Sequence, residues 1–133
     1  TSRIYPGIPE YFRADGRGVY HYLTGAASWY MLTMVTESFG VHGKAGDLVL
    51  YPKLLSEQFD GQGRASITTQ FADKTFQIHY DNPNQKDFGK YIIKKATCDN
   101  KEIDITDDAF AFITKADLAN LNDEVHEIII TLD

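Results

Sequence analysis

The sequence contains a single cysteine and lacks any long hydrophobic run. Cys98 has no partner for an internal disulfide or a thiolate metal cluster, which is typical of a protein from a reducing compartment, and we expect it to behave as a half-buried small hydrophobe. No apolar stretch approaches the roughly 18 residues of a membrane-spanning helix, and "TSRIYPGIPEYF" lacks the basic start and apolar stretch of a signal peptide. These absences predict a soluble, cytoplasmic protein.

Positive charge is scarce. The chain has 13 Lys and Arg against 19 Asp and Glu, scattered along the sequence, for a formal net charge of −6. This balance argues against nucleic acid and anionic membranes as partners. The four histidines, His21, His42, His79 and His126, are far apart, so we expect no metal site, and we expect His79 and His126 to face solvent from strands. Signatures of a P-loop, a dinucleotide fold or a Gly-x-Ser-x-Gly elbow are absent.

What the sequence does contain is enough apolar residues for a core. At 133 residues and 43% hydrophobic content, one core, or one core with an appended piece, is expected. The chain starts without methionine and enters an aromatic, proline-rich segment at once, from which we expect a fragment of a longer protein.

The first part of the chain combines loop chemistry with one apolar helix. Residues 1 to 18 are rich in proline, glycine and aromatic residues without a steady period, so we expect an ordered loop. From Ala26 to Phe39, apolar residues recur at spacings of three and four, and Gly40 follows where a helix C-cap places glycine. Few positions of this helix are polar, so it is expected to be largely buried.

The rest of the chain has the pattern of short strands. We expect strands at 48–51, 65–71, 75–80, 91–96 and 127–132, and one helical turn within "TKADLANLND". Phe76, Ile78 and Tyr80 alternate with polar residues, which predicts one buried face. The expected fold is mainly β, an antiparallel sandwich or jelly roll at 45–133 preceded by a loop and one buried helix at 1–44. A small sandwich cannot cover every face of so apolar a helix, and other helices would be the missing partners.

The stretch "YHYLTGAASW" places Thr24 and Gly25 at the start of that helix. A helix N-terminus offers unpaired N–H groups and the positive end of the helix dipole, which favour a phosphate or carboxylate. Threonine is also a common N-cap without any ligand. The residues alone leave both interpretations open.

Other candidate residues surround this stretch. Arg17, in the loop "DGRG", could contribute a cation to an anion site or lie in a surface turn. Glu10 and Asp15 are either paired carboxylates or solvated loop residues. The aromatic residues from Tyr5 to Tyr30 suit sugar stacking and core packing alike.

The stretch from Gly7 to Leu54 resembles the C-terminal part of the cellobiose phosphorylase family, glycoside hydrolase family 94. The shared features are the Pro-Glu-Tyr loop, Gly-Arg-Gly, the Leu-Thr-Gly-x-Ala-x-Trp helix start and the "L-x-P-x-L" segment. The resemblance implies that residues 1–44 hold the last loop and helix of an (α/α)6 catalytic barrel and that a jelly roll follows. Residues after 54 are similar to the family in pattern only.

The resemblance also implies an activity. Such enzymes, which transfer a hexosyl group, split a disaccharide or oligosaccharide with inorganic phosphate and invert the anomeric centre to give an α-sugar 1-phosphate. Phosphate is a co-substrate, and no cofactor or metal is implied. Thr24 and Gly25 match phosphate-binding positions, while Glu10, Tyr11 and Arg17 fall where the family lines its sugar sites. The general acid, an aspartate, and the family's arginine and histidine have no counterpart here, so the fragment is expected to be inactive by itself.

Two further hypotheses belong to other classes of protein. A carbohydrate-binding β-sandwich module would use aromatic residues such as Tyr51 or Tyr80 to stack on sugars. A structural domain would seal the barrel and support a homodimer.

Overall fold

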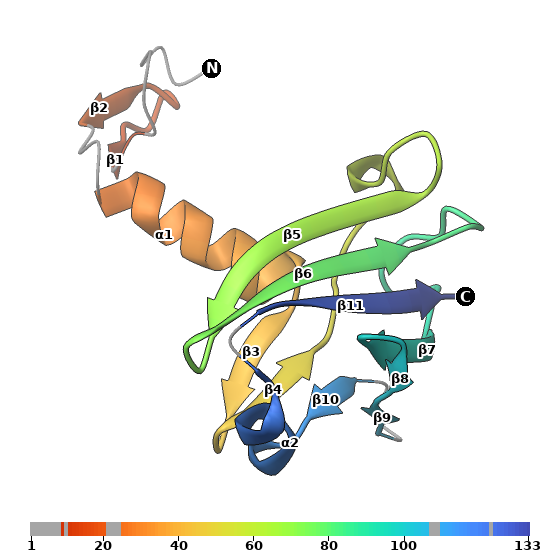
Figure 1. Cartoon of the computed structure of the whole chain (residues 1–133). Coiled ribbons are helices and arrows are strands. Elements are labelled where there is room, and N and C mark those ends of the chain that lie inside the picture. Colours follow the sequence, from red (N-terminus) through yellow and green to blue (C-terminus); the bar gives the residue numbers. More distant parts are fainter. Residues whose placement is uncertain (1–8, 10, 21–24, 107–109, 123) are drawn as a thin grey trace. The chain divides into compact units, whose positions relative to one another are not determined.

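The computed structural model describes residues 9, 11–20, 25–106, 110–122 and 124–133 of the chain (Figure 1). The chain divides into two compact units, one ending at Met34 and the other beginning at Val35. This division lies before the expected boundary at residues 44 and 45, since β3 (Val41–Lys44) pairs with β4 (Asp47–Leu50) and so belongs to the β unit.

The first unit contains a short hairpin and a helix. Strands β1 (Tyr11–Phe12) and β2 (Gly18–Tyr20) pair antiparallel where the sequence predicted a loop. The turn between them forms because Gly16 adopts a positive φ of 76° and its N–H donates to the Arg13 carbonyl at 2.9 Å. This turn brings two short segments into register that showed no strand pattern of their own.

The predicted helix is present, but its predicted burial is wrong for this chain. Helix α1 covers Gly25–Thr33, and a π-helical turn continues it over Met34–Ser38, close to the expected span of Ala26 to Phe39. None of the residues of α1 is buried. Its unit offers, among the described elements, one small hairpin besides the helix, which is too little surface to enclose it.

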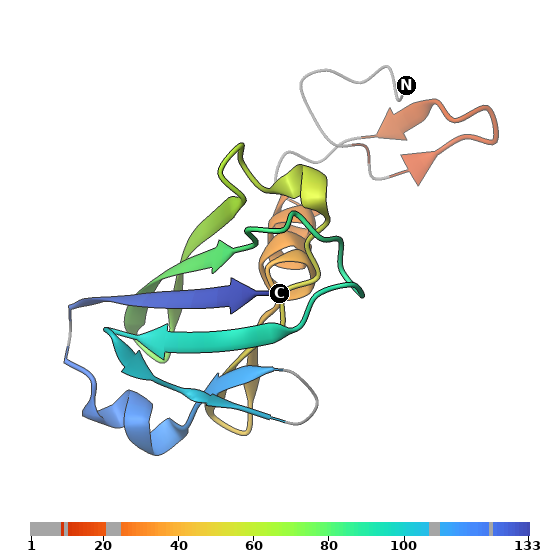
Figure 2. The same ribbon diagram turned by 90° about the vertical axis from the view of Figure 1, so that its right-hand side faces the viewer.

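The second unit is built from two sheets, so the mainly β class is confirmed (Figure 2). One sheet has the order β3-β4-β10-β9 and the other has the order β5-β6-β11-β7-β8. The remaining strands are β5 (Arg64–Phe71), β6 (Lys74–Asp81), β7 (Ile93–Cys98), β8 (Lys101–Glu102), β9 (Asp104–Ile105), β10 (Ala111–Ile113) and β11 (Val125–Leu132). Helix α2 (Lys115–Asn120) is the helical turn expected in "TKADLANLND", and a 3-10 turn forms at Ser56–Gln58.

One strand pair departs from the antiparallel expectation. β11 pairs parallel with β6 and antiparallel with β7, whereas the other described pairs are antiparallel. Parallel neighbours need a long connection, and residues 82–124 supply it with two further strand pairs and α2. The jelly-roll pattern of hairpins therefore does not describe this central pair.

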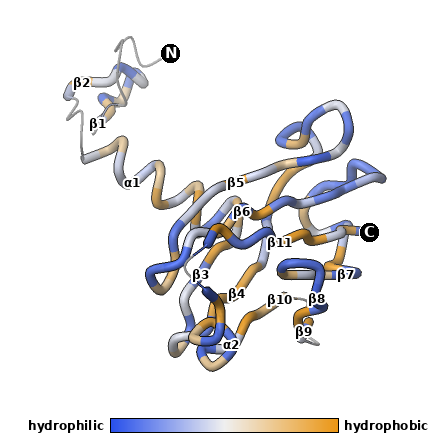
Figure 3. The backbone as a smooth tube through the Cα atoms, viewed as in Figure 1, coloured by the Kyte–Doolittle hydropathy of each residue, from blue (hydrophilic) through white to orange (hydrophobic). Residues whose placement is uncertain are grey.

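The two sheets share one hydrophobic core. Phe76, Ile78 and Tyr80 alternate inward on β6 as predicted, and Leu48 and Leu50 of β4 belong to the same buried cluster. The Tyr80 hydroxyl donates to the Phe39 carbonyl, and burial raises the pKa of this phenol. Figure 3 shows the hydrophobic stretches along the strands of this unit and hydrophilic residues in the loops between β5, β6 and β7. No helix among the described residues is long and apolar enough to cross a membrane.

Gly40 provides a test of this packing. It has a φ of +68°, and a Cβ at this position would overlap the backbone carbonyl of Tyr51, whose N–H donates to the Gly40 carbonyl at 2.8 Å. We expect Gly40→Ala to lower the free energy of unfolding by more than about 1 kcal/mol, measured by chemical denaturation. Gly61→Ala is the matched control, because a Cβ there meets nothing within 4 Å. Equal stabilities of the two variants would contradict the packing described.

Candidate functional site

The predicted phosphate residues lie at the start of α1. Thr24 lies outside the described residues, and Gly25 is the first residue of the helix, as expected from the sequence. The first turn of α1 carries no acidic residue, so no side chain of that turn would repel an anion at the helix N-terminus. Anion binding by Thr24 and Gly25 stays a prediction.

The predicted sugar-site residues lie on the hairpin where they are described. Glu10 lies outside the described residues, while Tyr11 is exposed on β1 and Arg17 is exposed in the turn before β2. The Arg17 N–H donates to the Asp15 carboxylate at 3.1 Å, which stabilises the turn. The hairpin thus places an aromatic ring and a guanidinium on one small element.

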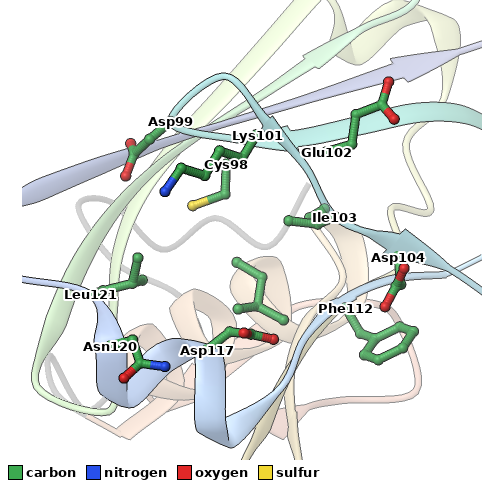
Figure 4. A pocket seen from close by; sticks show the side chains of 11 residues that line it. Cys98, Asp99, Lys101, Glu102, Ile103, Asp104, Phe112, Asp117, Asn120 and Leu121 are labelled. Carbon is green, nitrogen blue, oxygen red and sulfur yellow. The ribbon is translucent and has the colours of Figure 1, made fainter.

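The β unit contains a cavity of about 300 Å³ between three segments. Its walls are the β7–β8 hairpin, the β9–β10 pair and α2 (Figure 4). Figure 4 shows the Cys98 thiol and the Lys101 ammonium on the hairpin wall, with Asp117 and Asn120 projecting from α2. Four carboxylates and one lysine line the cavity, so its charge disfavours phosphate.

Apart from Cys98, the residues that line this cavity were not singled out from the sequence. The lining residues come from the stretch between Cys98 and Leu121, in which the sequence shows turns, short apolar runs and one helical turn. The convergence of these segments depends on strand pairing. The cavity has no sequence signal by which it could have been found.

Cys98 is buried, in agreement with its predicted role as a small hydrophobe. Burial, and then the negative charge of Asp99, raise the pKa of the Cys98 thiol to about 11. The thiolate is the nucleophilic form, so the thiol is unreactive at neutral pH. Cys98 therefore lines the cavity as a protonated thiol at neutral pH.

The two strand histidines differ in their positions. His79 is on the polar face of β6, where its Nδ1 lies 2.7 Å from Ser66 Oγ, and its Nε2 is 3.6 Å from the Glu127 carboxylate, longer than a hydrogen bond. His126 was predicted to face solvent, but it is buried. It shares the alternation of Ile128 and Ile130, which face the core, and this parity was the signal that the prediction overlooked.

A second hollow, of about 160 Å³, is lined by aromatic side chains. Tyr51, Phe88 and Tyr91 contribute their rings, with Tyr51 edge-to-face against Phe88 at 5.9 Å between centroids. The Tyr91 hydroxyl donates to the Pro52 carbonyl at 3.0 Å and accepts from the Leu54 N–H at 2.9 Å, which fixes its ring. Tyr80, the other proposed stacking residue, is fully buried and cannot contact a sugar.

Comparison with known proteins assigns no family. The chain matches no protein-family model and no curated protein. Within the described residues, no group of three or more His, Cys, Asp or Glu side chains is arranged to hold a metal ion. The functional argument therefore depends on the motifs of the sequence and the surfaces of the two units.

The chemistry of Cys98 can be tested directly. A thiol with a pKa of about 11 is ionised to about one part in a thousand at pH 8, against about a quarter for an ordinary thiol. We expect a thiolate-selective reagent to label the native chain about two orders of magnitude more slowly than the chain unfolded in guanidinium. Equal labelling rates in the two states would show that the cavity wall does not protect the thiol.

Proposed function

We propose that this chain is the C-terminal part of a disaccharide phosphorylase similar to glycoside hydrolase family 94. The complete enzyme cleaves a glycosidic bond of a disaccharide or oligosaccharide with inorganic phosphate in the cytoplasm, with inversion. Residues up to the end of α1 complete an (α/α)6 barrel, and the β unit is the jelly-roll-like domain that follows it. The chain by itself is inactive.

The observation that carries this proposal is the surface of α1. Trp29, Tyr30, Met31 and Leu32 are four consecutive large apolar residues, and each is between 52% and 71% exposed. Successive helical residues are about 100° apart, so these four point in all directions around the axis. A helix that is apolar all round is stable in water when protein covers it on every side. Neighbouring helices of a barrel provide such a cover.

The energy of covering these side chains is large. Burying an aromatic or aliphatic side chain of this size stabilises a protein by about 1.5–3 kcal/mol, so the four together are worth several kcal/mol. The hairpin also exposes large aromatic side chains, because Tyr11, Phe12 and Tyr20 are all at least half exposed. This surface suits both contact with a barrel and stacking on a sugar ring.

The chemistry of phosphorolysis fits the start of α1. Phosphate takes the place that activated water has in an inverting hydrolase and attacks the anomeric carbon, while an aspartate protonates the departing oxygen. The N–H groups after Gly25 and the Thr24 hydroxyl would donate to the phosphate oxygens. The aspartate, an arginine and a histidine would come from the rest of the barrel. The family pattern has serine where this chain has Ala26, so that hydroxyl contact is lost.

The phosphate role of Thr24 is tested in the protein extended by the coding sequence that precedes Thr1. We expect Thr24→Val to raise the KM for phosphate about tenfold or more, because a hydrogen bond to a charged group is worth about 1.5–3 kcal/mol. Thr33→Val, the same change at the other end of α1, is the matched control and should leave the KM unchanged.

Three outcomes would overturn the proposal. They are an upstream coding sequence without a helical barrel and a suitably placed aspartate, release of sugar 1-phosphate by the chain alone, and equal phosphate KM values for the two valine variants.

A second candidate function is favoured by the hollow at Tyr51 and Phe88. Two aromatic rings set edge-to-face around an accessible hollow are a surface on which a pyranose can stack. In this alternative, the β unit is a carbohydrate-binding module that works without phosphate.

Affinity for polysaccharide tests this alternative. We expect Phe88→Ala to abolish retention of the chain on a polysaccharide column, because it removes one wall of the hollow. Val125→Ala, at an exposed apolar residue of β11 that does not line the hollow, is the control, and this variant and Thr24→Val should both be retained. Lack of retention of the unmodified chain on any column would rule the module out.

A further inference from the structure

The β unit contains a buried histidine, His126, whose role does not depend on the proposed function. His126 is 4% exposed and lies on the core face of β11, directly opposite Phe76 in the register with β6. The imidazole and the Phe76 ring are 5.7 Å apart between centroids. A buried imidazole must satisfy both of its nitrogens within the protein.

Both nitrogens of His126 face acceptors. Nδ1 lies 2.7 Å from the Asp99 carboxylate, and Nε2 lies 3.2 Å from the Asn122 carbonyl oxygen. A neutral imidazole has one N–H and can donate to one of them, whereas the imidazolium donates to both. The geometry therefore requires the protonated form to make the two hydrogen bonds together.

One partner lines the 300 Å³ cavity, and the other directly follows residues that line it from the opposite side. Asp99 is in the turn between β7 and β8, whereas Asn122 follows Asn120, the last residue of α2, and Leu121, both of which line the opposite wall. The second carboxylate oxygen of Asp99 accepts from the Glu127 N–H at 3.0 Å, and the Asp99 N–H donates to the Glu127 carbonyl at 2.9 Å. These bonds fix the β7–β8 turn to β11. The imidazole joins the chain after α2 to the same turn.

We propose that His126 is a proton-dependent clamp that, as an imidazolium, ties the β7–β8 turn to the end of α2 and holds these two walls of the cavity together. Loss of the proton leaves Nδ1–H on Asp99, because that bond is to a charged acceptor. The Nε2 lone pair then faces the Asn122 carbonyl, and the wall formed by α2 is released.

Opposing effects act on the pKa values of His126 and Asp99. Burial lowers the pKa of His126, and Lys74 lowers it further, but the hydrogen bonds to Asp99 and Asn122 and the charge of Asp99 outweigh them, so the net pKa is raised. Burial raises the pKa of Asp99, but His126, the Glu127 N–H and Lys101 outweigh it, so that net pKa is lowered. Among the described residues, the other charged groups next to the clamp are Glu124, which accepts from the Asn122 amide, and Glu127 on β11.

These directions give the pH window of the clamp. A raised pKa for His126 means that its contribution is complete below the ordinary histidine pKa and is lost as pH rises through the folded value. A lowered pKa for Asp99 means that its contribution is lost as pH falls through the folded value. The clamp is therefore closed at pH values between the folded-state pKa of Asp99 and that of His126.

The experiment follows the His126 imidazole by NMR and the Leu118 and Leu121 amides by hydrogen exchange, both as a function of pH in the whole chain. We expect His126 to titrate above the ordinary histidine range. Corrected for intrinsic rates, exchange of the Leu118 and Leu121 amides should accelerate with the same midpoint. The Asp99 amide should stay protected, since its bond to Glu127 does not involve the ring.

Asp99→Asn removes the charged acceptor and should lower the His126 titration midpoint by at least about 1 pH unit. Asp104→Asn is the matched control, because Asp104 lines the same cavity from β9 in the other sheet. An ordinary midpoint in the unmodified chain, α2 exchange that does not follow the titration, or equal shifts in the two variants would each overturn the clamp. The first two readouts decide the question even if Asp99→Asn does not fold.

Discussion

The parallel pairing of β6 with β11 is the constraint on which the β unit depends. It places the inward side chains of the two strands opposite each other, Ile78 against Ile128 and Tyr80 against Ile130, and all four are fully buried. Each burial of this kind is worth about 1.5–3 kcal/mol, so the pair forms the centre of the core. β5 is added to β6, β7 is added to β11, and the second sheet supplies Leu48 and Leu50 to the same cluster.

The same pairing determines which polar groups become interior. Because His126 shares the inward parity of Ile128, the register carries a titratable ring to the rim of the core, next to Phe76. A polar ring in that position needs partners, and the β7–β8 turn and the end of α2 supply them. The cavity walls are therefore connected through a side chain whose place is fixed by apolar packing.

The two units differ in how far their apolar side chains are buried. From Val35 onward, most large apolar residues lie in or against one buried cluster, whereas α1 exposes Trp29 and its neighbours. A helix nine residues long is marginal in water without packing of an apolar face. The contrast supports a working state in which other protein surrounds the first unit, and this expectation is shared by the phosphorylase proposal and the motifs around Thr24.

Local features of this protein were determined by the sequence alone: the helix that starts at Gly25, the positive φ at Gly40, the alternation of β6 and the helical turn of α2. They follow from side-chain periodicity and turn chemistry, which act over a few residues. The direction of β11, the burial of His126 and the cavity were decided by tertiary structure. The Asp99–His126 contact joins residues far apart in sequence, and which strands pair depends on the total burial of a core that no short segment encodes.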